Sequence, residues 1–98
     1  MAKWDNENTE ALVKAILALE NPRETKKFLR DLLTEQEILE MGKRWKAARM
    51  LNQNIPYSVI ERETKLSSAT IARISMWLQE GTGGYRLMLD RLYANGKE

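Results

Sequence analysis

Residues 57–78, with the sequence YSVIERETKLSSATIARISMWL, constrain the fold of this chain more than any other stretch. Apolar residues recur at steps of three and four on both sides of a short break, which predicts two helices joined by a tight turn. Ser67 follows the break, and its side chain can cap the second helix by accepting the backbone N–H of Ala69 or Thr70. Four apolar residues stand where they can hold the two helices at a steep crossing: Ile60, Leu66, Ile71 and Ile74. The stretch therefore predicts a helix-turn-helix, which we place at residues 56–79.

The second helix of this motif begins with small and polar side chains. The residues expected to face outward are Ser67, Ser68, Ala69, Thr70 and Arg73. A helix with so little bulk at its start, and with one arginine, suits insertion into the major groove of DNA. We therefore predict that this helix contacts double-stranded DNA.

The composition argues against several other classes of function. The 98 residues include no cysteine and no histidine, so the chain lacks disulfides, thiolate chemistry and the commonest metal ligand. No run approaches the roughly 18 apolar residues of a membrane-spanning helix, and the N-terminus lacks the apolar segment of a signal peptide. We expect a cytoplasmic protein that is not an enzyme, holds no metal or other cofactor and does not enter a membrane.

Charge is distributed unevenly along the chain. Residues 1–40 carry six Lys or Arg against nine Asp or Glu, a net charge of −3, and residues 41–98 carry ten against five, a net charge of +5. Lys43, Arg44, Lys46 and Arg49 stand together just before the helix-turn-helix. Such a cluster can contact DNA phosphates, but it is equally typical of a solvated helix face.

Three further helices are predicted ahead of the helix-turn-helix. A loose polar arm at residues 1–8 precedes a helix at residues 9–20. Asn21 and Pro22 cap and start the second helix. Its expected buried residues are Phe28, Leu29, Leu32 and Leu33. Thr34 and Glu37 can satisfy each other's backbone donors in a capping box, which opens a long third helix reaching about residue 51.

One more helix, at residues 85–94, follows a glycine-rich connection in which Gly81 is the expected C-terminal cap. The total is six helices and no strand. The apolar stripes of the first two helices and of the last are too broad for so small a monomer to cover. We therefore predict one all-α domain, residues 1–98, that forms a homodimer through helices within residues 9–53 and 85–95. A two-fold dimer presents two recognition helices to two DNA half-sites.

Three short motifs, in this order and spacing, resemble the tryptophan repressor superfamily. They are Leu32-Leu33-Thr34 before the third helix, Gly42-x-Arg44 within it, and Ala69-Thr70-Ile71-x-Arg73 in the second helix of the helix-turn-helix. The match covers residues 32–78, about half of the chain, and the chain looks closer to the shorter repressor-related proteins of the YerC/YecD type. The resemblance implies an intertwined, all-helical homodimer with a helix-turn-helix on each side.

The resemblance also implies an effector pocket between the DNA-binding region and the dimer core. The two arginines that sandwich the indole ring of tryptophan in that family match Arg44 and Arg73, which could instead be ordinary phosphate contacts. Two small pocket residues of the family are replaced here by Ile74 and Trp77. Either Trp77 fills part of the pocket, which would make the protein active without tryptophan, or it belongs to the core. These departures put tryptophan as the corepressor in doubt.

At the DNA-binding positions of the family this chain also differs. Glu61 stands where a lysine contacts DNA, so the operator sequence of the family should not be transferred. Ser68 and Ala69 match base-facing positions, and Ala72 replaces a threonine there. Lys65 and Arg62 are further candidates for contacts with the DNA backbone, although both could simply be solvated.

These observations lead to one prediction and one alternative. We predict that the protein is a dimeric transcriptional regulator, and more specifically a repressor that acts by occupying a two-fold operator. The alternative is an adaptor that uses the helix-turn-helix as a scaffold for binding another protein, which Glu61, Glu63 and the modest net charge of +2 favour. Binding that weakens steeply with salt would favour DNA, because it reports displaced counterions.

Overall fold

The computed structural model of the protein describes residues 2–94. Within that range the chain forms six α-helices and no strand, as predicted. Its contacts divide it into two compact units, residues 1–38 and residues 39–98, which are described in turn. The single domain over residues 1–98 stays a prediction, and residue 95 of the predicted C-terminal dimerisation helix lies outside the described residues.

The first unit contains α1 (Glu7–Leu17) and α2 (Pro22–Leu32). Helix α1 begins two residues earlier than predicted, because Asn6 caps it. The Asn6 side chain accepts the backbone N–H of Thr9 at 3.1 Å, and the Thr9 hydroxyl oxygen accepts the backbone N–H of Asn6 at 2.8 Å. The predicted arm of residues 1–8 is therefore too long, since Glu7 and Asn8 are helical, and α1 also ends before the predicted Glu20.

The starts of the next two helices are as predicted. Asn21 caps α2 by accepting the backbone N–H of Glu24 at 2.9 Å, and Pro22 occupies the first helical position. The capping box of Thr34 and Glu37 is present at the start of α3 (Glu35–Asn52), with N···O distances of 2.9 and 3.1 Å. Both signals act within four residues of the chain, which explains why the sequence predicts them correctly.

Neither α1 nor α2 has a buried residue. On α1 the apolar side chains of Val13, Ile16 and Leu17 are 50%, 48% and 78% exposed. On α2, Phe28 and Leu29 are half-buried, whereas Leu32, which was predicted to be buried, is 48% exposed. The apolar stripes that the sequence predicts are present, and the described residues of this unit leave most of their area uncovered.

The capping box is expected to make helix α3 sensitive to acid. Hydrogen bonds from the backbone N–H and the hydroxyl of Thr34 lower the pKa of the Glu37 carboxyl below its ordinary value. A lowered pKa stabilises the folded state above the ordinary carboxyl pKa of about 4.3 and loses that contribution as the pH falls through the lowered pKa. We therefore expect the melting temperature of the wild type to fall more steeply on acidification than that of Glu37→Gln, which keeps the acceptor without the charge. Identical pH profiles for the two proteins would contradict this role.

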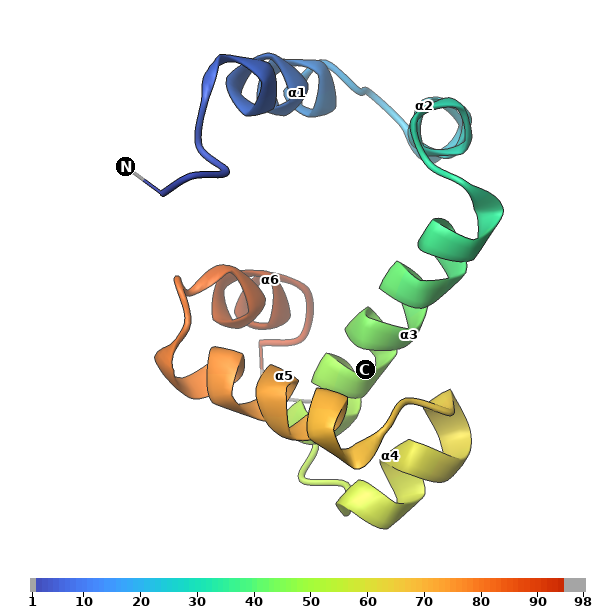
Figure 1. The fold of residues 1–98 in the computed structure, drawn as a ribbon, viewed down its shortest axis with the longest axis vertical. Coiled ribbons are helices and arrows are strands. Elements are labelled where there is room, and N and C mark those ends of the chain that lie inside the picture. Colours follow the sequence, from blue (N-terminus) through green and yellow to red (C-terminus); the bar gives the residue numbers. More distant parts are fainter. Residues whose placement is uncertain (1, 95–98) are drawn as a thin grey trace. The chain divides into compact units, whose positions relative to one another are not determined.

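The second unit holds the rest of α3, α4 (Tyr57–Thr64), α5 (Ser68–Glu80) and α6 (Gly84–Leu92). Helix α5 packs against α4 and α6, and Figure 1 shows it crossing the C-terminal end of α3. The core lies at this crossing. It consists of Ala47 and Ala48 from α3, the four apolar residues predicted to lock the helix-turn-helix, and partly buried side chains packed around them. The two alanines let α3 approach closely, since they add little bulk between the helices.

Besides packing against α5, helix α6 makes two side-chain contacts with α3. The rings of Trp45 in α3 and Tyr85 in α6 are stacked, with centroids 6.3 Å apart and an interplanar angle of 14°. Arg86 donates from Nη2 to the Oδ1 atom of Asn52 at the end of α3, and from Nε to Asp90 at 3.1 Å. Among the described helices, none is both long and apolar enough to cross a membrane.

Candidate nucleic-acid interface

The turn between α4 and α5 is built by a buried threonine. Thr64 is 2% exposed, and its hydroxyl donates to the Ile60 carbonyl at 2.7 Å and accepts the backbone N–H of Leu66 at 3.2 Å. Both hydrogen-bonding capacities of the buried hydroxyl are therefore used, which avoids the cost of an unsatisfied polar group. Leu66 then enters the core at 7% exposure and fixes the exit direction of the turn.

Ser67 caps α5 as predicted. Its side chain accepts the backbone N–H of Thr70 at 3.2 Å, and its hydroxyl donates to the Thr70 hydroxyl oxygen at 3.0 Å. Of the two alternatives offered by the sequence, Ala69 and Thr70, Thr70 provides the N–H. The hydroxyl groups of Ser67 and Thr70 thus orient the N-terminus of α5, and a contact between either group and DNA stays a prediction.

Helix α5 has one face in the core and one in solvent. Ile71 and Ile74 are fully buried. The side chains on the opposite face, which recur at steps of three and four residues along the helix, are exposed. The exposed residues include four of the predicted DNA contacts: Ser68, Ala69, Ala72 and Arg73. They form one continuous stripe from the capped end of the helix. Further along the helix, Met76 and Trp77 are 50% and 41% exposed.

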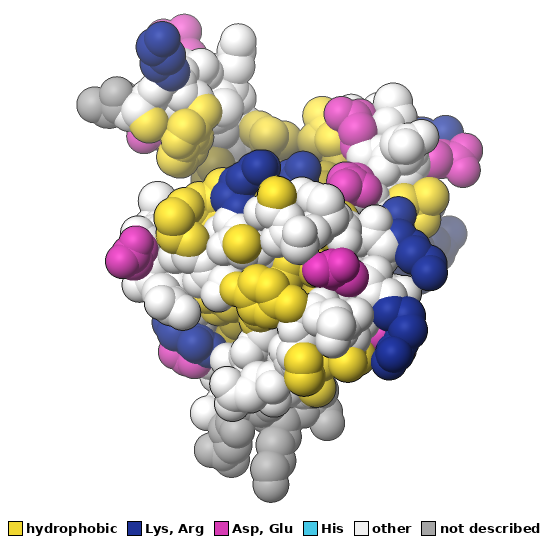
Figure 2. Space-filling view, turned by 60° about the horizontal axis from the view of Figure 1, so that its bottom comes forward, with side chains coloured by type: hydrophobic (Ala, Val, Ile, Leu, Met, Phe, Trp, Pro, Cys, Tyr) yellow, Lys and Arg dark blue, Asp and Glu magenta, His cyan; other side chains and the backbone are white. Residues whose placement is uncertain are grey.

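One residue of the predicted basic cluster on α3, Lys46, forms an ion pair with an acidic residue. Nζ of Lys46 lies 3.6 Å from Oε1 of Glu63, so this pair joins α3 to α4. Both side chains are more than 40% exposed, and such a pair contributes on the order of 0.2–1 kcal/mol. Lys43 and Arg44 remain exposed on α3. Figure 2 brings the α4–α5 end of the molecule forward and shows basic side chains in separate groups, with uncharged and hydrophobic side chains between them.

The four predicted effector-pocket residues have different environments. Ile74 is part of the core of the second unit, whereas Arg44 and Arg73 are exposed and Trp77 is 41% exposed. Trp77 is therefore not a core residue of the single chain. The groove described below has other walls. An effector pocket formed by these four residues stays a prediction.

One aromatic contact between α3 and α6 could not be predicted from the sequence. Partial burial raises the pKa of the Tyr85 hydroxyl, and the positive charge of Arg44 acts in the opposite direction. Tyr85 also stacks on Trp45, the residue after Arg44. The aromatic residues were visible in the sequence, but no local pattern pairs two positions so far apart in the chain.

Lys65 occupies a backbone conformation that side chains rarely adopt, with φ 62° and ψ 17°. We expect Lys65→Gly to retain or slightly raise the stability, because the left-handed conformation costs a non-glycine residue about 1–2 kcal/mol. The same variant should bind duplex DNA more weakly, since it removes a predicted phosphate contact, and the slope of log affinity against log salt should become shallower. Thermal melts and DNA titrations at two salt concentrations would measure both effects.

The matched control is Lys65→Asn, which tolerates the left-handed conformation and also lacks the charge. The two variants should lose DNA affinity equally and differ only in stability. Unchanged affinity and salt dependence in both would remove Lys65 from the DNA-binding surface.

Comparison with known proteins places these features in a family context. Residues 7–93 match the family described as Trp repressor protein. The uncharacterised protein YerC of Bacillus subtilis (strain 168) is 37% identical over 90 residues, which are 92% of this chain and 86% of YerC.

Two crystal structures are also similar in fold. One is of a candidate Trp repressor from Staphylococcus aureus, with 39% identity, a TM-score of 0.85 and coverage of 92% of this chain and 90% of the other. The other is of a TrpR-like protein from Eubacterium eligens, with 36% identity, a TM-score of 0.86 and coverage of 92% and 93%.

Proposed function

Because this chain belongs to the Trp repressor family, we propose that it is a homodimeric transcriptional repressor that occupies a two-fold DNA operator. Membership of the family makes it a helix-turn-helix DNA-binding regulator and not an enzyme. Repressor activity, binding to a two-fold operator and formation of a homodimer go beyond family membership and are our proposal. The observation that supports operator binding is the exposed stripe of small residues and Arg73 along α5, with Ile71 and Ile74 buried behind it.

In this proposal α5 lies in the major groove. Ser68, Ala69 and Ala72 have little side-chain bulk, so the helix backbone can approach the base edges closely. Arg73, one turn further along, can donate to a guanine or to a phosphate. Lys65 and Arg62, both exposed on the α4 side of the turn, would hold the DNA backbone. These contacts position the helix, while the residues of the stripe provide the sequence preference.

The homodimer is supported by uncovered apolar surface. In the first unit, α1 and α2 have no buried residue although they carry broad apolar stripes. A second copy of the chain is the simplest partner that covers them, and two-fold symmetry would place two α5 helices for two half-sites.

We further propose that operator binding does not require tryptophan. Ile74 is fully buried in the core, and the Trp77 ring lies on the exposed side of the same helix. Both side chains are larger than the residues of the family that make room for the ligand. Trp77 would thus occupy part of the volume that an indole needs.

The alternative function, an adaptor that binds another protein, is supported less by the structure than by the sequence. Glu63 pairs with Lys46, so its charge contributes to the contact between α3 and α4. Glu61 remains exposed and would still repel phosphate. Salt dependence separates the two functions, because protein–protein docking releases no condensed counterions.

The test is selection of bound sequences from random duplex DNA without added amino acids, at two salt concentrations. We expect the wild type to enrich a two-fold motif whose half-sites are about one helical turn apart. Arg73→Ala should bind that motif at least about tenfold more weakly. Arg23→Ala, in the exposed part of α2, is the matched control and should bind normally. Failure to enrich any motif, together with salt-independent binding, would exclude the repressor.

The same selection with added tryptophan tests the effector. Equal enrichment with and without tryptophan is expected. Enrichment only in its presence, or micromolar binding of tryptophan in a calorimetric titration, would show that Trp77 does not fill the pocket.

A further inference from the structure

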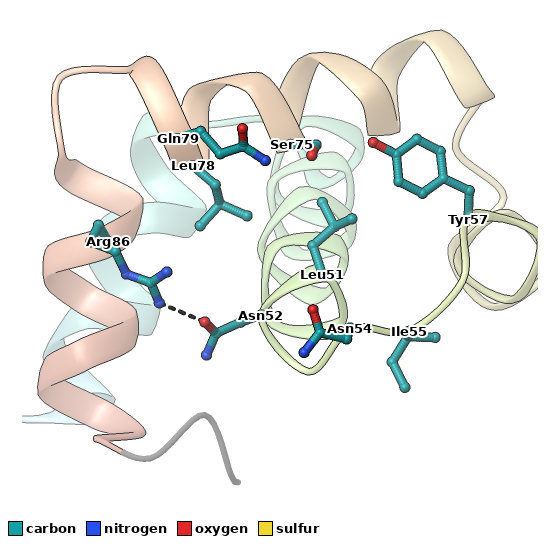
Figure 3. Close-up of a pocket in the computed structure, with 9 residues that line it drawn as sticks. All are labelled: Leu51, Asn52, Asn54, Ile55, Tyr57, Ser75, Leu78, Gln79 and Arg86. Atoms are coloured by element: carbon teal, nitrogen blue, oxygen red, sulfur yellow. Dashed lines mark hydrogen bonds between the residues drawn. The ribbon is translucent and has the colours of Figure 1, made fainter.

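The second unit contains a groove of 420 Å³ outside the exposed stripe of α5. Its walls come from the end of α3, the link to α4, the start of α4, the later half of α5 and the first turn of α6 (Figure 3). The size falls within the range of small-molecule sites, which is about 300–1,000 Å³. Leu51 and Leu78 provide apolar surface in this groove.

Polar side chains surround that apolar surface. Figure 3 shows the Gln79 amide and the Ser75 hydroxyl extending from α5, with the Tyr57 ring across from Leu51 and the Asn54 amide at the lower edge. An amide carries a donor and an acceptor side by side, so it can form paired hydrogen bonds with a planar partner that offers the complementary pair. Asn54 has φ 61°, a conformation that asparagine tolerates better than most residues, and it brings its amide to the groove.

The groove has little net charge to offer a ligand. Arg86 is the one charged residue among those that line it. Its Nη2 donates to Asn52 and its Nε to the Asp90 carboxylate at 3.1 Å. Because the guanidinium already has a carboxylate partner, the groove favours an uncharged ligand that forms hydrogen bonds.

We propose that this groove binds a free nucleoside through its purine or pyrimidine base. The base edges carry adjacent donors and acceptors that match the Asn54 and Gln79 amides, as such amides match adenine in DNA. The Tyr57 ring, 41% exposed, provides a flat surface on which a base can stack. Leu51 and Leu78 cover the apolar part of the ring. This inference does not rest on the repressor function, and it is tested without duplex DNA.

The experiment is a titration of the full chain with adenosine and with uridine, followed through the side-chain amide signals in ¹H–¹⁵N spectra. We expect saturable shifts of the Asn52, Asn54 and Gln79 amides with at least one nucleoside. The amides of Asn8 in α1 and Gln36 at the start of α3 lie outside the groove and should not move. Ribose alone should cause no shift. Absence of a saturable shift with both nucleosides, or an equal shift with ribose, would overturn the proposal.

Two variants test the stacking contact. Tyr57→Ala should weaken binding about fivefold to a hundredfold, which corresponds to the loss of one base–aromatic stack. Tyr57→Phe keeps the ring and should bind within a few-fold of the wild type. The backbone amide spectrum of each variant shows whether the fold is retained, and the exposure of Tyr57 makes this the expected result.

A single-stranded thymidine oligomer, titrated in parallel, identifies the source of the base. Shifts with the oligomer alone would mean that the groove takes bases from nucleic acid, and the free-nucleoside proposal would fail. Wild-type affinity for nucleosides in Tyr57→Ala would also overturn it.

Discussion

Replacing Ile71 with alanine should lower the free energy of unfolding by about 2–5 kcal/mol. Ile71 is 0% exposed and belongs to the core formed by α3, α4 and α5. Truncation removes buried methyl and methylene groups and leaves a cavity between helices that the Ser67 cap and the Thr64 turn hold in place. The loss is a large part of the 5–15 kcal/mol typical of a small domain, so DNA binding should be lost with it. Urea denaturation followed by circular dichroism measures the change.

The matched control for this prediction is Met76→Ala on the same helix. Met76 is 50% exposed, so its truncation should cost well under about 1 kcal/mol. If both variants unfolded at the same urea concentration, Ile71 would not lie in the core while Met76 faces solvent.

Replacing Leu17 with glutamate should convert the proposed dimer into a monomer. Leu17 is 78% exposed within the chain, and Ile16 beside it is 48% exposed. In an isolated monomer a glutamate at position 17 would lie in water and change stability by less than about 0.5 kcal/mol. In a dimer that covers α1 it would bury an unpaired charge, which costs several kcal/mol and raises the dissociation constant by a factor of about a thousand or more. Sedimentation velocity over a range of concentrations distinguishes the two cases.

Lys14→Glu, also in α1, is the control because it makes a larger change of charge at an exposed polar position. It should remain dimeric. If Leu17→Glu sedimented as the wild type does, the apolar face of α1 would not be the dimer interface, and the explanation for its exposure would have to change.

The local features of this protein could be predicted from its sequence. Ser67, Asn21 and Thr34 each cap a helix as expected, and in each case the hydrogen bond spans only three residues. The four apolar residues of the helix-turn-helix are buried as expected, because helical periodicity alone determines which side of each helix they share. The first helix begins two residues before its predicted start, because Asn6 and Thr9 form a capping box ahead of the apolar stripe.

Other features depend on residues that only the fold brings together. The Lys46–Glu63 pair divides a cluster that looked uniformly basic, and the Trp45–Tyr85 stack connects α3 to α6. The groove around Leu51, Ser75 and Gln79 has walls from four helices, and no stretch of the sequence contains it.

The sequence by itself thus determined the all-α class, most of the helix starts and the residues that form the core of the helix-turn-helix, because caps and periodicity act over one or two turns. It also carried the motifs through which the family was identified. Only the tertiary structure decided which charged groups pair, which aromatic rings stack and where a groove opens. These outcomes depend on the crossing of α3, α4, α5 and α6, and a crossing is set by how side chains distant in the chain pack against one another.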